Sequence, residues 1–441
     1  MMQHTPPLPG RAIRGRLLNF LREPIGPGDR DSYSYIADGA LHVVDGRIAA
    51  VGAAEDILPT LPPGTPVDNH PDGLILPGFI DLHIHMPQTQ VIASYGTQLL
   101  DWLERYTFIE EQKYADPAHA AAGARFFMDE LLRNGTTTAV AYGSVHPQSV
   151  EALFAEAERR GACMIAGKVM MDRNAPDALR DNAQSSYDDS KALIERWHGR
   201  ERLRYAVTPR FAITSTEAQL EAAGALLREH PDTYMQTHLS ENTDEIAYVR
   251  TLFPAARDYT DVYDRFGLLG PRSLFGHCIH LSDAELDRLA ETESVAVFCP
   301  TSNLFIGSGL FDLDRLRNRA APVRVGLATD VGGGTSYSML RTLAEAYKVL
   351  QLRRQNLPAL SAFHQITRAN AAALGLEEEI GVLEPGRFAD LVVLDASATP
   401  AMAHRMETVR GNLEEELFIL LTLGDDRAVR RTYVRGQPVD L

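Results

Sequence analysis

The sequence LPGFIDLHIH, residues 76–85, ends an apolar, strand-like run with two histidines at alternating positions. Alternate residues of a β-strand point to the same face, so the imidazoles of His83 and His85 lie side by side. Taken alone, the pair is typical both of a bidentate metal site and of hydrogen-bonded core histidines. The positions of the other candidate ligands distinguish these two interpretations.

Strand-like and helix-like segments alternate around and after this stretch, from about Leu76 to Leu383. Helical periodicity follows the apolar segments, as in Pro147–Arg160 and Thr216–His230. Eight such units predict an α/β protein with a (β/α)8 TIM barrel, in which catalytic groups gather at the C-terminal ends of the strands. The strand candidates are Leu74–His85, Thr137–Gly143, Cys163–Met171, Leu203–Phe211, Tyr234–Leu239, Ser273–His280, Val295–Pro300 and Val323–Asp330.

Further metal-type side chains fall at the ends of later strand candidates. His238 ends the fifth, Glu241 follows it by three residues, His277 lies in the sixth, and Asp330 ends the eighth. The strand ends of a barrel share one rim, so these groups are expected to meet the two histidines of the first strand. Nitrogen and oxygen ligands without a thiolate favour Zn2+, with Fe2+ or Mn2+ as lesser alternatives. An imidazole ligand with a carboxylate beside it is typical of metal-assisted hydrolysis.

Both ends of the chain contain short strand-like runs. Leu41–Gly52 and Arg431–Val439 each combine an apolar run, a glycine turn and a second apolar run, which is the pattern of a β-hairpin. Phe388–Asp395 is a further strand candidate. Ends that are alike in this way can pair with each other outside the barrel.

Composition and charge exclude several classes of protein. The 441 residues include 43 Lys and Arg against 59 Asp and Glu, a formal charge of −16, which argues against a nucleic-acid partner. No apolar stretch approaches the ~18 residues of a membrane span. Met1–Arg16 has no hydrophobic region typical of a secretion signal, so we expect no membrane partner and a cytoplasmic location. The isolated cysteines Cys163, Cys278 and Cys299 are predicted to be reduced core residues.

Motifs along most of the chain resemble the amidohydrolase superfamily. Its barrels carry an HxH pair on strand one, histidines on strands five and six, and an aspartate on strand eight, as here. The chain is most similar to those members that act on guanine, and the similarity runs from about Val51 to the C-terminus. The matching segments include HLSEN at 238–242, CPTSNL at 299–304 and SYSML at 336–340. The more specific matches are HMPQ at 85–88, SYG at 94–96, LLDWL at 99–103 and VTPRF at 207–211.

This resemblance implies a domain organisation, a reaction and a set of ligands. A small β-sandwich domain would be formed by both chain ends, residues 1–75 plus 384–441, beside a barrel domain of residues 76–383. The reaction would be hydrolytic removal of the 2-amino group of guanine, giving xanthine and ammonia, in a homodimer with one Zn2+ per subunit. The metal ligands would be His83, His85, His238 and Asp330, with His277 as a contact of the metal-bound water or a further ligand.

The chemistry of such a deamination suits these residue types. A bound dication lowers the pKa of its water from about 15.7 to ~7. Glu241 is expected to take a proton from that water and pass it to the ring nitrogen N3 and the leaving amine. Asp330 would accept a proton while anchoring the metal, and His277 would donate to the developing alkoxide. Glu241, Asp330 and His277 are therefore the predicted catalytic residues.

The end of the fourth strand candidate suggests how the ring is recognised. The guanidinium of Arg210 can donate two parallel hydrogen bonds to the O6 and N7 acceptors of guanine, a pattern that adenine lacks. Gln88 offers a donor and an acceptor to another edge, and Phe211 offers a face for stacking. A salt bridge to an acidic loop is the structural alternative for Arg210. The predicted substrate contacts are Gln88, Arg210 and Phe211, together with His85, His238, Glu241 and Asp330.

Two other functions fit parts of the pattern. A barrel hydrolase of another heterocycle, such as 8-oxoguanine, a thio-substituted adenosine or a triazine, would share the metal ligands, and only Arg210 and Gln88 favour a guanine-like ring. A non-catalytic assembly protein would have lost ligands, whereas all are present here. Lys168 could bridge a second metal ion, as in some relatives, and His280 is more readily a hydrogen-bonding partner than a ligand.

Overall fold

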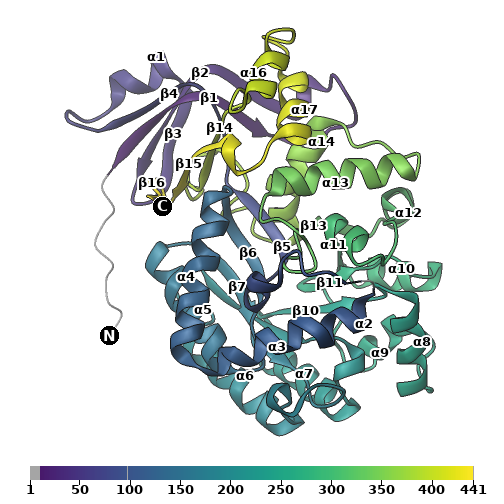
Figure 1. The fold of residues 1–441 in the computed structure, drawn as a ribbon. Helices are drawn as coiled ribbons and strands as arrows, with labels where there is room; N and C mark the ends of the chain where they lie inside the picture. Colours follow the sequence, from purple (N-terminus) through teal and green to yellow (C-terminus); the bar gives the residue numbers. More distant parts are fainter. Residues whose placement is uncertain (1–9, 97, 441) are drawn as a thin grey trace.

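The structure is a computed structural model that describes residues 10–96 and 98–440. Its strands form a nine-stranded parallel sheet and a seven-stranded mixed sheet. Figure 1 shows helices surrounding the first sheet, which closes into a barrel, and the mixed sheet lying beside it. The predicted α/β fold, a (β/α)8 barrel with a β unit built from both chain ends, is confirmed. The first nine residues of the predicted end domain lie outside the described residues.

The barrel strands follow one another in sequence order. They are β5 (Phe79–His85), β6 (Thr136–Tyr142), β7 (Cys163–Gly167), β9 (Leu203–Pro209), β10 (Tyr234–Leu239), β11 (Ser273–His277), β12 (Val295–Phe298) and β13 (Arg324–Leu327), with the short β8 (Val169–Met170) beside β9. Backbone hydrogen bonds close the ring, because Asp330 N donates to His83 O at 2.9 Å and His85 N donates to Val331 O at 2.7 Å. The first and last strands therefore meet at the end that carries the two histidines.

Helices follow the barrel strands and cover the outside of the barrel. Several begin at a residue whose side chain accepts a hydrogen bond from the first turn, as Asn182, Asn242 and Ser282 do in capping boxes. The helices of the barrel are α4 (Pro117–Arg133), α5 (Pro147–Arg160), α6 (Ala183–Trp197), α7 (Glu217–Glu229), α8 (Thr243–Leu252), α9 (Tyr259–Asp264), α10 (Asp283–Glu291), α11 (Pro300–Phe305), α12 (Leu313–Arg317), α13 (Met339–Leu352), α14 (Ala359–His364) and α15 (Asn370–Ala373). The short α2 (Leu99–Trp102) and α3 (Phe108–Glu111) lie between β5 and α4.

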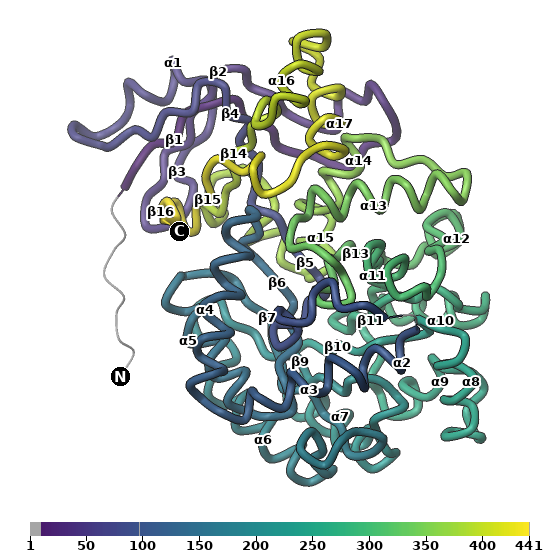
Figure 2. Tube along the Cα trace, viewed as in Figure 1, coloured from purple at the N-terminus to yellow at the C-terminus, as the bar shows by residue number. Residues whose placement is uncertain are grey.

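The second sheet joins the two chain ends. Figure 2 shows strands from the start of the chain beside strands from its end, and the hydrogen-bonded order is β16-β15-β14-β4-β1-β2-β3. The predicted hairpins at Leu41–Gly52 and Arg431–Val439 are confirmed by the antiparallel pairs β2–β3 and β15–β16. The strands are β1 (Arg11–Phe20), β2 (Tyr33–Val44), β3 (Arg47–Ala53), β4 (Val67–Pro77), β14 (Leu391–Leu394), β15 (Val429–Val434) and β16 (Gln437–Pro438), and α1 (Ala54–Ile57), α16 (Pro400–Met406) and α17 (Leu413–Leu423) accompany them.

The predicted first barrel strand, Leu74–His85, is in fact two strands. Leu74 to Pro77 pair antiparallel with β14 in the end sheet, whereas β5 begins at Phe79 and belongs to the barrel. Gly78 lies at the change of sheet, where its N–H donates to Asp390 O at 2.8 Å. A Cβ at this position would lie 2.6 Å from Thr137 Cγ2, so glycine permits the close approach. The sequence does not reveal that the chain passes from one sheet to the other here, because both segments are buried and form one continuous apolar run.

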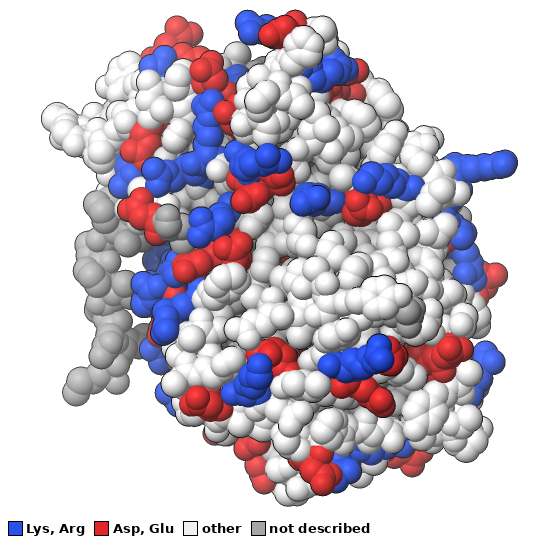
Figure 3. All heavy atoms as spheres, viewed as in Figure 1, with Lys and Arg blue, Asp and Glu red and all other residues white. Residues whose placement is uncertain are grey.

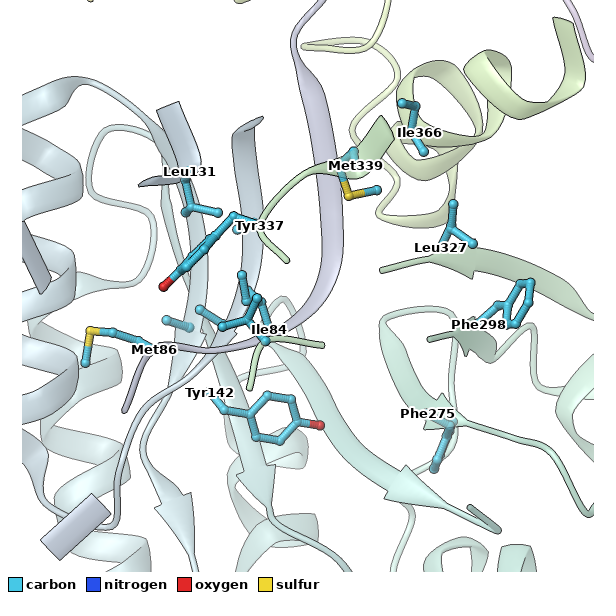
Figure 4. Close-up of a cluster of buried hydrophobic side chains, with 14 of the residues drawn as sticks. Ile84, Met86, Leu131, Tyr142, Phe275, Phe298, Leu327, Tyr337, Met339 and Ile366 are labelled. Atoms are coloured by element: carbon cyan, nitrogen blue, oxygen red, sulfur yellow. The ribbon is translucent and has the colours of Figure 1, made fainter. Parts of the chain in front are cut away.

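Buried apolar side chains from the strands and the helices form one large core around the barrel. Figure 4 shows Ile84, Tyr142, Phe275 and Leu327 from four different strands within it. Tyr142 also stacks on the ring of His85 with a centroid distance of 4.4 Å. Close packing of this kind holds the strand ends, and the side chains that they carry, in fixed positions.

A buried ion pair connects the barrel to the end sheet. Arg202, which precedes β9, donates from Nη1 to Asp390 Oδ1 at 3.1 Å and from Nη2 to Asp390 Oδ2, and each side chain is 3% exposed. Asp390 Oδ1 also accepts from Arg435 N at 3.0 Å. The guanidinium carbon of Arg202 lies 4.2 Å from the ring centre of Phe388. One carboxylate thus links three segments that are distant in the sequence.

Asp390→Ala is expected to lower the free energy of unfolding by about 3–5 kcal/mol, because it leaves the buried charge of Arg202 without a partner. The shift of a denaturant unfolding curve measures this effect. The control is Asp38→Ala, which removes a partner of Arg14 in a solvent-exposed ion pair and should change the curve far less. Equal shifts for the two variants would show that burial of the Arg202–Asp390 pair does not increase the cost of removing one partner from the free energy of unfolding.

Two predictions about the whole chain can be compared with the structure. Cys163, Cys278 and Cys299 are buried and free, as expected. Among residues 10–96 and 98–440, the helices are all too short or too polar to cross a lipid bilayer.

Candidate active site

The four predicted metal ligands converge at the C-terminal ends of the barrel strands. His85 Nε2 lies 3.2 Å from His83 Nε2 and 3.3 Å from His238 Nε2. Asp330 Oδ1 lies 3.4 Å from His83 Nε2 and 3.3 Å from His85 Nε2. A tetrahedral ion with bonds of about 2.0–2.1 Å holds its ligands about 3.3 Å apart. The spacing of these donor atoms therefore fits one such ion.

The protonation states of these side chains also suit a cation. Burial lowers the pKa of His83 and His238, and it lowers the pKa of His85 to about 3, so all three imidazoles are neutral. Burial alone would raise the pKa of Asp330, but the neighbouring histidines hold that pKa well below its usual range. Neutral imidazole nitrogens beside an ionised carboxylate are the donors that a divalent metal ion requires.

Neighbouring groups fix the directions of the ligands. His238 Nδ1 lies 2.7 Å from Arg210 O, a pure acceptor, so Nδ1 carries the proton and the lone pair of Nε2 faces the site. The ring of His83 lies against Gly276 in β11, where a Cβ would be 2.5 Å from His83 Cε1. Asp81 Oδ1 accepts from His83 N at 3.2 Å and from Thr329 N at 3.1 Å, which joins β5 to the segment after β13.

Glu241 and His277 lie beside the group of four ligands. Glu241 Oε2 is 3.3 Å from His277 Nε2, and Glu241 Oε1 accepts from Ser308 Oγ at 2.9 Å. His277 Nδ1 lies 2.8 Å from Asn303 Oδ1, and its Nε2 lies 3.7 Å from Asp330 Oδ2. Burial, with the charge of Asp330, raises the pKa of Glu241 to about 8. A carboxyl group that titrates near neutral pH can both accept and release a proton.

Backbone conformation at the site is unusual at three positions. Ser240, His277 and Asp330 have φ angles of 50°, 71° and 52°, in the left-handed region that side chains disfavour. The capping box of Asn242 at the start of α8 turns the chain off β10 immediately after Glu241. Strained backbone of this kind is concentrated at functional sites, where the surrounding packing holds it in place.

A cavity opens beside the predicted ligands. Gln88, Arg210 and Phe211, the predicted ring contacts, all line it. The remaining lining residues are His85, His238, Glu241, His277 and Asp330 from the strand ends, Leu99, Trp102 and Leu103 from the segment after β5, and Ser302, Ile306 and Gly333. The cavity therefore combines an apolar wall, a few polar groups and the metal-type cluster.

Arg210 faces the cavity and also makes the salt bridge that was its structural alternative. Its Nη1 donates to Glu111 Oε2 at 2.8 Å, and the two side chains are 3% and 1% exposed. Sequence reasoning missed Glu111, Ser308 and Asn303, which contact Arg210, Glu241 and His277. The signal for Glu111 was an acidic pair at residues 110–111 in a short helix close to the apolar motif LLDWL, and it was too weak to identify the partner.

Other interactions account for three further side chains. Lys168 is buried, and its Nζ lies 2.5 Å from Asp181 Oδ2 and 3.3 Å from Val169 O. His280 Nε2 lies 2.8 Å from Ser308 O, so it is a hydrogen-bonding partner, as expected. Cys299 lies near His83 and Asp330, but burial raises its pKa well above the usual value and keeps the thiol protonated.

The chain matches the family model "Amidohydrolase family" over residues 74–439. It belongs to the amidohydrolase family. This amidohydrolase is 48% identical to guanine deaminase of Escherichia coli (strain K12) over 430 residues, which cover 97% of each chain. Its structure superimposes on that of E. coli guanine deaminase with a TM-score of 0.95, covering 98% of this chain and 99% of that one. It also resembles C. acetobutylicum guanine deaminase with guanine bound in the active site, at 29% identity, a TM-score of 0.86 and coverage of 98% and 100%.

Proposed function

We propose that this amidohydrolase is a guanine deaminase, which hydrolyses guanine to xanthine and ammonia. One observation carries the proposal: Arg210 and Gln88, which suit a guanine ring, line the same cavity as His85, His238 and Asp330, three of the four proposed metal ligands. The similarity to guanine deaminases over nearly the whole chain agrees with this reading. The enzyme is accordingly a hydrolase that acts on a carbon–nitrogen bond of a cyclic amidine.

Each polar group of the cavity has a proposed role. His83, His85, His238 and Asp330 would hold one divalent ion, proposed to be Zn2+, which supplies a nucleophilic hydroxide at neutral pH. Both protons of the attacking water are transferred. Glu241 carries one of them to the ring nitrogen N3, and the other, accepted by Asp330, goes to the 2-amino group, which leaves as ammonia. The bond from Ser308 Oγ keeps Oε1 of Glu241 in place, and Oε2, 3.3 Å from His277 Nε2, is the oxygen proposed to face the ring.

The remaining side chains bind and orient the ring. Arg210 donates to the O6 and N7 acceptors, Gln88 holds a further edge, and Phe211 offers its ring as a stacking surface. His277 turns Nε2 toward the oxygen that develops negative charge at C2, because its Nδ1 is bonded to Asn303 Oδ1. As an imidazolium, with both ring nitrogens protonated, it would donate a hydrogen bond to that oxygen. Contacts of His85, His238, Glu241 and Asp330 with the reacting face complete the proposed substrate site.

We also propose the organisation and setting of the enzyme. Residues 1–75 plus 384–441 form one domain and residues 76–383 form the barrel domain, in a cytoplasmic homodimer. A free base is the expected partner, rather than nucleic acid. Figure 3 supports this, because on the face it shows Lys and Arg are interspersed with Asp and Glu, and no continuous basic stripe crosses it.

Another heterocycle is the alternative substrate class, since the metal ligands would serve any hydrolysis of this kind. The purified enzyme should convert guanine to xanthine, seen as loss of guanine absorbance with release of ammonia. A screen of guanine, 8-oxoguanine, adenine, thio-substituted adenosine and a triazine separates the candidates. Turnover of another ring with none of guanine, in metal-loaded protein, would overturn the assignment.

A further inference from the structure

One buried carboxylate joins the two polar side chains that the cavity presents to a ring. Glu111, at the end of α3, accepts from Gln88 Nε2 at 2.9 Å and from Arg210 Nη1 at 2.9 and 2.8 Å. Its side chain is 1% exposed and is absent from the cavity lining, so it lies behind Gln88 and Arg210. We propose that Glu111 is a positioning residue that determines which purine edge the site accepts, an inference that rests on the proposed function.

Two hydrogen bonds fix the direction of the Gln88 amide. Its Nε2 donates to the carboxylate of Glu111, and its Oε1 accepts from Gly332 N at 3.3 Å. An ionised carboxylate only accepts hydrogen bonds, so a half-turn of the amide would place oxygen against oxygen and NH2 against N–H. Both bonds would be lost and buried polar groups left unpaired. Glu111 and Gly332 thereby fix which part of the amide is a donor and which an acceptor toward the ring.

Glu111 and Phe108 also orient the guanidinium of Arg210. Glu111 binds its Nη1, whereas Nε and Nη2 make no hydrogen bond to any residue that the structure describes. The guanidinium carbon lies 5.5 Å from the ring centre of Phe108, in the same short helix as Glu111. A planar guanidinium held at one nitrogen and on one face has a defined orientation. The donors left for a ligand therefore point in one direction.

Together these contacts make the site selective for an acceptor at position 6 of the ring. Guanine presents O6 there, whereas 2,6-diaminopurine carries an amine, a donor that meets the donors of Arg210. Both bases carry the 2-amino group that is removed, but they differ at position 6 and at N1, which bears a hydrogen only in guanine. The change in the ratio of their kcat/KM values from the wild type to a variant at 111 reports the positioning, because the intrinsic difference between the two bases is common to both proteins.

Glu111→Gln keeps the shape of the side chain but removes the charge and lets the amide at 111 donate as well as accept. We expect kcat/KM for guanine to fall about 10-fold to 100-fold, mainly through KM, because a well-aligned bidentate contact gives discrimination of this order. Turnover of 2,6-diaminopurine should fall less, so the guanine preference should shrink about tenfold or more. Steady-state kinetics on both bases, with metal content measured for each protein, provide the test.

The matched control is Glu110→Gln. Glu110 lies in the same helix, but its carboxylate pairs with Lys113 at 2.5 Å and with His119 at 3.6 Å, neither of which lines the cavity. This variant should keep the wild-type preference for guanine. If Glu111→Gln does not fold, Glu111→Asp replaces it: the shorter acid keeps the charge but cannot reach both Gln88 and Arg210, and the preference should again shrink.

Two results would count against the inference. An unchanged ratio of kcat/KM for the two bases in both variants at 111, whether or not both values fall, would make Glu111 a structural residue only. Absence of guanine turnover by the wild-type enzyme would overturn the proposed function and this inference with it. Guanine turnover by the wild type with an unchanged ratio in the variants would overturn this inference alone.

Discussion

Glu241→Gln is expected to keep the bound metal ion and to lose about 10²–10⁴-fold in kcat. An amide of the same shape can accept the bond from Ser308 Oγ, but it cannot take up and release a proton. Glu241 also belongs to neither group of described residues that could hold a metal ion. Metal analysis of the purified variant, together with single-turnover rates on guanine, tests both parts of the expectation.

The control for this variant is Asp244→Asn. Asp244 is an exposed carboxylate in the first turn of α8, three residues after Glu241, and its side chain makes no contact with the cavity. The substitution Asp244→Asn should leave kcat close to the wild-type value. Loss of the metal ion from Glu241→Gln would identify Glu241 as a ligand instead, and its role in proton transfer would then be wrong.

Removal of the metal ion is expected to reduce turnover by about 10³–10⁴-fold or more, because Lewis-acid catalysis contributes several kcal/mol to the rate. Dialysis against a chelator should yield a folded, inactive protein, since the large apolar core does not depend on the ion. Activity should return on addition of Zn2+, and the activities regained with Fe2+ and Mn2+ rank the candidate metals. Ammonia release measures the recovery.

Binding stoichiometry provides an independent readout of the same experiment. One ion per chain is expected, because His83, His85, His238 and Asp330 form a single set of converging donors and Lys168 is paired with Asp181. Full activity of metal-free protein would rule out a metal-dependent reaction. Two ions per chain would contradict the single-ion site.

Much of the candidate site could be predicted from the sequence because strand ends mark it. Alternation of apolar strands and helices indicated the barrel, and His83, His85, His238 and Asp330 each lay at or next to the end of a strand candidate. The topology then required these residues to meet, since parallel strands of one barrel share a rim. Arg210 stood out by its place at the end of the fourth strand; it lines the cavity, and the salt bridge given as its alternative is present, while its contact with a purine ring stays a prediction.

The partners of these residues could not be predicted in the same way. Glu111 lies 99 positions from Arg210, and no local pattern connects a short helix before α4 with the end of β9. The break at Gly78 was hidden as well, because β4 and β5 are both apolar and buried. Which sheet each joins depends on β14, more than 300 positions away, as in the pairing of Leu391 with Pro77.

The sequence by itself determined the types of ligand, the order of strands and helices, and an acidic charge that disfavours nucleic acid. These properties are local or additive, since they depend on periodicity, composition and residue type. Only the tertiary structure decided the direction of the Gln88 amide, the pairing of Arg210 with Glu111 and the spacing of about 3.3 Å that suits one ion. These properties depend on side chains brought together by packing from distant segments, and no single segment contains that information.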